Sequence, residues 1–286
     1  MQLSNKSTSI ARVKWSIDLL CACTGYTEYM PDDKRIHATH SKFGHYEVID
    51  TTYNNRPARV LYSGGGLVAQ SGVALDDVPE LLFDYNQRFL ELVRGLRPNR
   101  VLLIGGGAFT LPNALLAEFP KLRLDVVEID PVLFQIGQQY FDFTPSKHTT
   151  VHIIAGEKFL EDSEQQYDLI VLDAFFESAI PSVFQTNKNA RQMAAHLRLG
   201  GVLAINIISS YYGHRSFTLR RQIEALGTAF TNVQLFPAGY EPSLWLPQNF
   251  IVTAQNGIRE LQPYMRYAAV QLPDNTGDAL YRNAAS

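Results

Sequence analysis

Five short apolar runs between residues 101 and 205 constrain the fold more than any other feature of this sequence. Each run is four or five residues long, as expected for a strand that is buried on both faces of a sheet. Roughly 20–30 residues separate most neighbouring runs, which is enough for a crossover helix. Right-handed crossovers then give an α/β protein with an open, doubly wound, Rossmann-like parallel sheet. The runs are residues 101–104, 124–128, 151–154, 169–172 and 202–205.

The segments on either side of these runs predict smaller elements. Alternating residues at 46–50 and 58–62, around a turn at 54–57, indicate a β-hairpin. Residues 233–236 and 250–253 are expected to form an antiparallel pair at one edge of the main sheet. Residues 76–80 combine acidic side chains with a proline, which is typical of a helix start, and this helix is expected to run to about Gly95.

These patterns divide the 286 residues into three parts. We expect an N-terminal β-hairpin unit at residues 1–75 and a Rossmann-like nucleoside-binding catalytic domain at residues 76–256. Residues 257–286 are expected to be a C-terminal tail, because they show no clear pattern.

Composition restricts the partners of the chain. The formal net charge is −3 at pH 7, so no strong field attracts nucleic acid or an anionic membrane. No apolar run approaches the ~20 residues of a membrane-spanning helix. The two cysteines, Cys21 and Cys23, are too few for a zinc site and are expected to be reduced thiols. A cytoplasmic protein without a metal and without nucleic-acid or membrane partners is therefore expected.

A glycine run and an acidic residue follow the first two predicted strands. Gly105, Gly106 and Gly107 allow a sharp turn and a close approach of a ligand to the backbone. Glu128 ends the second strand, where a carboxylate accepts hydrogen bonds from both ribose hydroxyls. Two simpler interpretations remain: the glycines serve only the turn, or the acid caps the next helix, which fits Asp130 better than Glu128. NAD binding is less favoured, because Thr110 occupies the place of its third glycine.

The third and fourth predicted strands also end in acidic residues. Gly156 and Glu157 follow the third strand, and Asp173 and Ala174 follow the fourth. Because the carboxyl ends of adjacent parallel strands meet in one crevice, Glu157 is expected near an adenine and Asp173 near the reacting centre. A solvated Glu157 without a role is the alternative.

Together these residues resemble the polyamine aminopropyltransferases, or spermidine synthases, which have the class I methyltransferase fold. The likeness spans residues 41–256. Residues 101–107 are similar to the first-strand motif of that family, residues 127–131 to its ribose-binding motif, and residues 167–173 to the strand that ends in its catalytic aspartate.

The resemblance implies a transferase of polyamine biosynthesis that acts on an amine or another small nucleophile. The co-substrate is S-adenosylmethionine or its decarboxylated form, no metal is needed, and a homodimer is common in the family. Asp173 is implied as the catalytic base, and Tyr240 and Glu177 are implied at the substrate site, with Trp245 in the same segment as Tyr240. The residues implied at the nucleoside are Gln70, Gly105, Gly106, Gly107, Glu128, Ile129, Gly156, Glu157, Asp173 and Ala174.

Three departures from that family change the expected substrate. Ala108 and Phe176 replace two aspartates that hold a polyamine in the family, and Glu157 replaces an aspartate at the adenine position. Desolvating a dication without carboxylate partners costs several kcal/mol, so poor activity with putrescine is expected unless Glu177 or another acid compensates. Acceptor identity and the choice between aminopropyl and methyl transfer stay open. A catalytically idle nucleoside-binding or scaffold protein, and an NAD-linked oxidoreductase, remain as alternatives.

Overall fold

The N-terminal part of the molecule is a four-stranded antiparallel sheet. This computed structural model describes residues 33–64, 68–76, 80–175, 180–239, 244–257, 259–261, 264–265 and 268–270. The predicted hairpin is confirmed, and its two-residue turn places Asn54 and Asn55 at positive φ, as such a turn requires. Strands on either side of the hairpin, which the sequence did not predict, complete the sheet. Its strands, in spatial order, are β1 (Lys34–His40), β2 (His45–Tyr53), β3 (Arg56–Ser63) and β4 (Val68–Ala74).

The larger sheet has seven strands in the order β10-β11-β9-β8-β5-β6-β7. The five predicted central strands pair in parallel, and the antiparallel pair at one edge is confirmed. β11 lies between β9 and β10, so β10 alone forms that edge. The fold is therefore the predicted α/β type. The strands are β5 (Arg100–Ile104), β6 (Arg123–Glu128), β7 (Thr149–Ile153), β8 (Tyr167–Leu172), β9 (Leu197–Ser209), β10 (Asn232–Pro237) and β11 (Gln248–Gln255).

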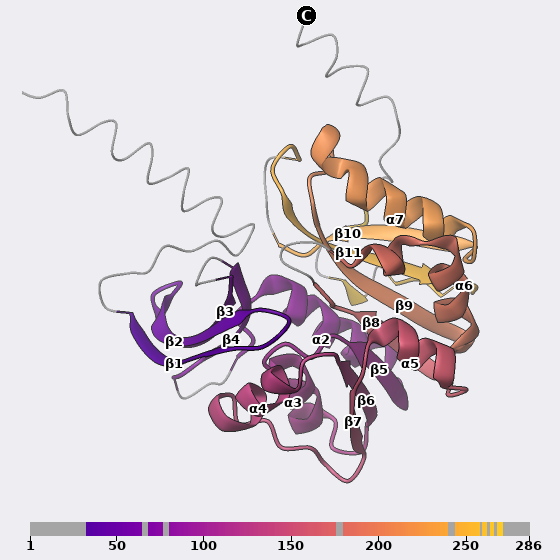
Figure 1. Ribbon diagram of the computed structural model, residues 1–286. Helices are drawn as coiled ribbons and strands as arrows, with labels where there is room; N and C mark the ends of the chain where they lie inside the picture. Colours follow the sequence, from indigo (N-terminus) through magenta and orange to yellow (C-terminus); the bar gives the residue numbers. More distant parts are fainter. Residues whose placement is uncertain are drawn as a thin grey trace, which may run out of the picture.

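Helices connect these strands and cover both faces of the sheet (Figure 1). Val101 and Leu103 of β5 pack among side chains of α2 and α3, whereas Leu102 and Ile104 pack among those of α5, α6 and α7. This alternation explains the continuous apolar run of β5, because both faces of the strand are buried. The helices are α2 (Asp84–Leu96), α3 (Thr110–Glu118), α4 (Pro131–Tyr140), α5 (Gly156–Asp162), α6 (Asn187–Ala195) and α7 (Phe217–Gly227), with short 3₁₀ turns at Ser182–Gln185 and His214–Ser216.

The predicted helix start at residues 76–80 is wrong, because α2 begins at Asp84. The preceding backbone is extended and pairs with β4. Leu81 forms an antiparallel bridge with Val73, and the Leu82 N–H donates to the Gly72 carbonyl oxygen at 3.2 Å. These hydrogen bonds satisfy the backbone in the extended form, so the helix starts later than the acidic segment suggests.

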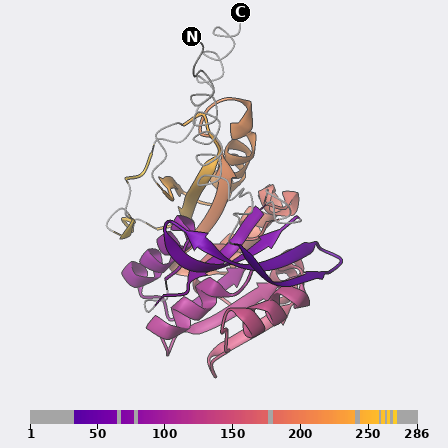
Figure 2. The same ribbon diagram turned by 90° about the vertical axis from the view of Figure 1, so that its left-hand side faces the viewer.

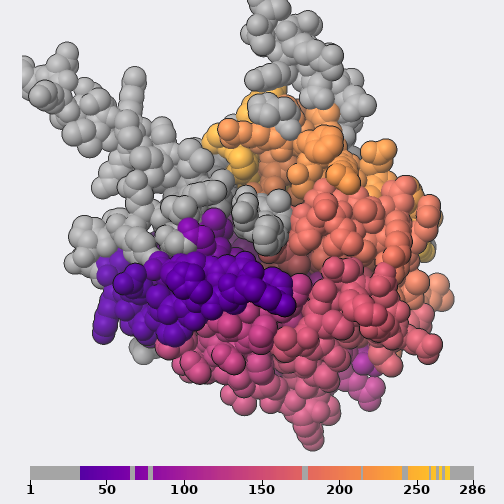
Figure 3. All heavy atoms as spheres, viewed as in Figure 1, coloured from indigo at the N-terminus to yellow at the C-terminus, as the bar shows by residue number. Residues whose placement is uncertain are grey.

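The antiparallel sheet is seated on the α/β domain (Figures 2 and 3). A buried cluster joins Tyr46 and Leu61 of the small sheet to Leu133 and Ile136 of α4. The Tyr46 hydroxyl also donates to an Asp130 carboxylate oxygen at 2.9 Å. The small sheet thereby covers the carboxyl ends of the parallel strands. Within the described parts of the chain, no helix is both long and apolar enough to cross a membrane.

Candidate active site

A cavity of about 750 Å³ lies between the carboxyl ends of the parallel strands and the small sheet. This is where a doubly wound sheet binds ligands, because the loops that follow its strands meet there. Ten residues that were predicted at the nucleoside line the cavity, and nine of them lie at the end of β6 or after β5, β6, β7 or β8. Gln70 reaches the cavity from β4. Those at or after the strand ends are Gly105, Gly106, Gly107, Glu128, Ile129, Gly156, Glu157, Asp173 and Ala174.

The glycine run after β5 has a structural role in addition to facing the cavity. Gly105 has φ +99°, and a Cβ atom there would lie 2.3 Å from the Asp173 carbonyl oxygen. Gly107 has φ +53°, and its Cβ would lie 2.6 Å from the Ser71 Oγ atom. A side chain at Gly105 would therefore push apart the loops after β5 and β8, and one at Gly107 would displace the Ser71 side chain of β4. Part of the glycine signal thus reflects this close packing.

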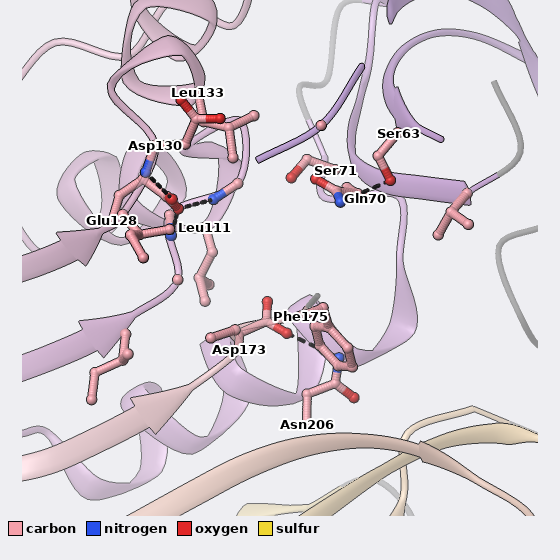
Figure 4. A pocket seen from close by; sticks show the side chains of 18 of the residues that line it. Ser63, Gln70, Ser71, Leu111, Glu128, Asp130, Leu133, Asp173, Phe175 and Asn206 are labelled. Carbon is pink, nitrogen blue, oxygen red and sulfur yellow. Dashed lines mark hydrogen bonds between the residues drawn. The ribbon is translucent and has the colours of Figure 1, made fainter. Parts of the chain in front are cut away.

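Glu128 is buried and organises the loop after β5 (Figure 4). Its Oε2 atom accepts hydrogen bonds from the Gly106 N–H at 2.8 Å and the Gly107 N–H at 3.3 Å, and its Oε1 atom accepts one from the Asp130 N–H at 2.9 Å. Burial raises the pKa of the Glu128 carboxyl, although these backbone hydrogen bonds oppose the shift. A carboxylate offers about four lone-pair sites, so it can still accept further donors from the cavity.

Asp130 has the different role that the sequence favoured for it. One carboxylate oxygen accepts a hydrogen bond from the Val132 N–H at 2.9 Å and so caps α4. The other accepts hydrogen bonds from Ser41 and Tyr46 of the small sheet. Asp130 therefore fastens the small sheet to the domain, and Glu128 remains free for the cavity.

Asp173 lies directly after the buried strand β8, with its side chain turned toward the cavity (Figure 4). Its N–H donates to the Ile104 carbonyl oxygen at 2.9 Å, which fixes the backbone. The Asn206 Nδ2 atom donates to Asp173 Oδ1 at 3.0 Å. Burial raises the pKa of the Asp173 carboxyl to about 7, and the hydrogen bond from Asn206 opposes this shift. A carboxyl group with this pKa can exchange a proton near neutral pH.

Several cavity residues were missed by the sequence analysis. The Tyr85 hydroxyl, at the start of α2, donates to the Gln70 carbonyl oxygen at 2.7 Å, while Gln70 Nε2 donates to Ser63 Oγ at 2.9 Å. Asn206 and Asn249 line the cavity from β9 and β11. An asparagine inside the apolar run of β9 is a signal that could have identified Asn206. Tyr85 and Asn249 carry no such signal.

The charged residues in the described lining of the cavity are of one sign. The carboxylates are Glu128, Asp130, Glu157 and Asp173, and the described lining contains no lysine or arginine. Apolar and aromatic side chains, among them Phe175, form much of the wall. Such a site favours a ligand that combines positive charge with an apolar or planar body. The described residues contain no cluster of histidine, cysteine, aspartate and glutamate that could hold a metal ion.

The remaining predicted substrate residues are not placed at the cavity. Glu177 and Tyr240 lie outside the described residues, as does Phe176. Trp245 is half exposed and packs its ring against Tyr212, with 5.3 Å between ring centroids, and it does not line the cavity. Ala108 packs into the apolar cluster beneath the small sheet.

Comparison with known proteins relates the chain to one enzyme family. The family described as "Spermine/spermidine synthase domain" matches residues 85–234. A polyamine aminopropyltransferase of Vibrio vulnificus is 38% identical over 102 residues, which are 34% of this chain and 34% of that protein. An N-terminal histidine N-methyltransferase of Emericella nidulans is 33% identical over 125 residues, which are 42% of this chain and 21% of that protein. The chain thus matches about a third and about a fifth of the lengths of these two relatives.

Solved structures support the fold. A probable spermidine synthase from Corynebacterium glutamicum superposes with a TM-score of 0.69, covering 87% of this chain and 93% of that chain at 18% sequence identity. This likeness extends over most of both chains.

Proposed function

Because the chain belongs to the spermine/spermidine synthase family, we propose that it transfers an aminopropyl group from decarboxylated S-adenosylmethionine to an amine. The observation that carries this proposal is the row of carboxylates around the cavity, which has no lysine or arginine among its described residues. Such a site suits a sulfonium nucleoside and a cationic acceptor.

The nucleoside would lie over the ends of β5, β6 and β7, which we call the donor side. Glu128 would accept hydrogen bonds from both ribose hydroxyls, and Glu157 would lie near the adenine. Gln70 would face the methionine-derived end of the nucleoside from the small sheet. The glycine run supports this arrangement, because it leaves the backbone open to the ligand.

The charge of the cavity favours the decarboxylated nucleoside. That molecule carries a sulfonium and an ammonium group and no carboxylate. S-adenosylmethionine carries an additional carboxylate, which would meet the carboxylates of the cavity without a described lysine or arginine to pair with it. An unpaired charge in a partly desolvated site is costly, and this difference disfavours S-adenosylmethionine.

Asp173 would act as the general base. The amine nitrogen forms a bond to the aminopropyl carbon next to sulfur as the carbon–sulfur bond breaks. The bonding electron pair moves to sulfur, which leaves as the neutral thioether methylthioadenosine. The amine loses one proton to the Asp173 carboxylate. The protein contributes mainly proximity and orientation, because the sulfonium is already a good leaving group.

Methyl transfer from S-adenosylmethionine is the second candidate. The similarity to an N-terminal histidine N-methyltransferase favours it. The same cavity would then place the methyl group near the acceptor nitrogen, and Asp173 would again take a proton.

Calorimetry with the two sulfonium nucleosides distinguishes the candidates. We expect decarboxylated S-adenosylmethionine to bind at least about tenfold more tightly than S-adenosylmethionine, because only the latter brings a carboxylate into the acidic cavity. Equal or tighter binding of S-adenosylmethionine would favour methyl transfer. If neither nucleoside binds, the proposed function is wrong.

The pH dependence of transfer offers a second test. Because burial raises the pKa of Asp173 to about 7, the base form predominates only above that pH. We therefore expect kcat/KM for the nucleoside to rise as the pH increases through about 7 and then to level off, since this parameter reports the ionisation of the free enzyme. The Asp173→Asn variant serves as the control and should lack this inflection. A wild-type profile that is flat between about pH 5.5 and 8 would contradict a role for this ionisation.

A further inference from the structure

A strip of polar side chains crosses the sheet beside Asp173. Leu172 of β8 is in register with Ile205 of β9, so Asp173 and Asn206 follow side by side, as their hydrogen bond at 3.0 Å confirms. Asn206 pairs with Ile251 of β11, and Asn249 lies two residues earlier on that strand. Two asparagines on one face of the sheet therefore continue outward from Asp173.

Both asparagines have a carbonyl oxygen without a partner in the described structure. Asn206 is buried, with 1% of its surface exposed, and its amide nitrogen is engaged by Asp173 (Figure 4). The Oδ1 atoms of Asn206 and Asn249 are buried and accept no hydrogen bond from the described residues. Buried carbonyl oxygens in native proteins nearly always accept a hydrogen bond. These two atoms in the cavity wall, like the Asn86 Oδ1 atom at the start of α2, are therefore available to a ligand that donates to them.

The carboxylates of the cavity are unevenly distributed, with more of them on the donor side than beside the two asparagines. Three of the four lining carboxylates among the described residues, Glu128, Asp130 and Glu157, lie at the end of β6 or after β6 or β7. Over β8, β9 and β11, which we call the acceptor side, the described lining holds Asp173 and neutral groups. One ammonium group finds a counter-charge there, whereas a second would face amide oxygens. A hydroxyl group can donate to one of these oxygens, and a carboxamide NH₂ group to both, without bringing a second charge out of water.

We propose that the acceptor is a monoamine with a hydroxyl or carboxamide at its other end, with the amine at Asp173 and the neutral donor group at Asn206 and Asn249. This inference rests on the proposed function, and it specifies the substrate class of the acceptor side. It assigns Asn249 as a specificity-determining residue.

Two amines of equal length test the assignment. We compare 4-aminobutan-1-ol with 1,4-diaminobutane. The first molecule has a hydroxyl group where the second has its other amine. Their affinities are measured by calorimetry on the full chain with saturating methylthioadenosine, the product nucleoside, so that no turnover is needed. We expect the amino alcohol to bind at least about tenfold more tightly than the diamine, because the described lining of the acceptor side offers the second ammonium no counter-charge.

A charge introduced at Asn249 should reverse this preference. Asn249→Asp supplies a carboxylate for the second ammonium, and we expect the diamine to gain at least about tenfold in affinity relative to the amino alcohol. Asn232→Asp makes the same charge change at the opposite end of the β10–β11 pair, where Asn232 is in register with Gln255. It should leave both affinities unchanged.

The outcomes separate this inference from the proposed function. If methylthioadenosine binds but the wild-type protein binds the diamine as tightly as the amino alcohol, the acceptor class is wrong and the proposed function stands. If Asn249→Asp leaves the preference unchanged, Asn249 does not contact the acceptor. If methylthioadenosine and both sulfonium nucleosides fail to bind, the proposed function fails, and the acceptor assignment fails with it.

Discussion

Replacing Asp173 by asparagine is expected to reduce the rate of transfer by about 10²–10⁴-fold, which is the usual effect of losing a positioned general base. Asparagine keeps the shape of the side chain and can still accept the hydrogen bond that Asn206 donates at 3.0 Å. It cannot take the proton of the attacking amine. Nucleoside binding should persist, because Glu128 and the glycine run are unchanged.

The same variant should not lose stability above neutral pH. The pKa of Asp173 is raised in the folded protein from 3.8 to about 7 by burial. The folded state therefore holds the proton more tightly than the unfolded state, and stability falls as the pH rises from about 4 through about 7. The asparagine side chain of the variant would carry no charge at any pH, so thermal unfolding at about pH 8 should show the variant at least as stable as the wild-type protein.

Asp168→Asn is the matched control for this prediction. Asp168 lies on the same strand, where its carboxylate accepts hydrogen bonds from the Asn99 and Arg100 backbone N–H groups at 2.9 Å. Its loss should affect unfolding and leave the transfer rate near the wild-type value. A near-normal rate for Asp173→Asn would remove Asp173 from the mechanism. Failure of that variant to fold would instead indicate a structural role.

Replacing Glu128 by glutamine is expected to weaken nucleoside binding by about 1–3 kcal/mol. The carboxylate accepts hydrogen bonds from three backbone N–H groups, those of Gly106, Gly107 and Asp130. In glutamine, an NH₂ group replaces one acceptor oxygen. This group would face a backbone N–H donor, and one ribose hydroxyl would lose its acceptor. Calorimetry with decarboxylated S-adenosylmethionine measures the change directly.

Two controls show whether the ribose is the group involved. The loss caused by Glu128→Gln should shrink for a 2′-deoxy analogue of the nucleoside, because one of the two hydroxyl partners is already missing. Glu157→Gln removes a charge from the same cavity without touching the loop after β5, and its effect should be smaller. Equal losses for both variants would indicate a general electrostatic effect, and an unchanged dissociation constant for Glu128→Gln would contradict ribose binding.

Part of the structure follows from local sequence patterns. A strand buried on both faces has to be apolar throughout, so the central strands were recognisable from runs such as residues 101–104. Parallel strands with crossover helices bring their carboxyl ends to one edge, and this placed Gly105, Glu128 and Asp173 around a single cavity. Asp130 was separable from Glu128, because its position before α4 is that of a helix cap.

Other features depend on contacts between distant segments, and local patterns do not encode them. The start of α2 at Asp84 was missed because residues 80–82 pair with β4, which competes with the helix-start signal. The hydrogen bond that the Ala108 N–H donates to Ser71 Oγ, and the one that the Tyr85 hydroxyl donates to the Gln70 carbonyl oxygen, depend on how the small sheet is seated on the domain. Spacing along the chain does not determine that arrangement.

The donor and acceptor sides of the cavity differ in the same way, because local sequence patterns predict the first and contacts between distant segments form the second. The sequence alone determined the donor side, because a glycine run and an acid at the ends of successive parallel strands meet whenever the sheet forms. Only the tertiary structure decided the acceptor side. Asn206 and Asn249 are 43 positions apart in the sequence, and they share a face because β9 and β11 pair antiparallel in one particular register. A shift of one residue would turn Asn249 to the other face.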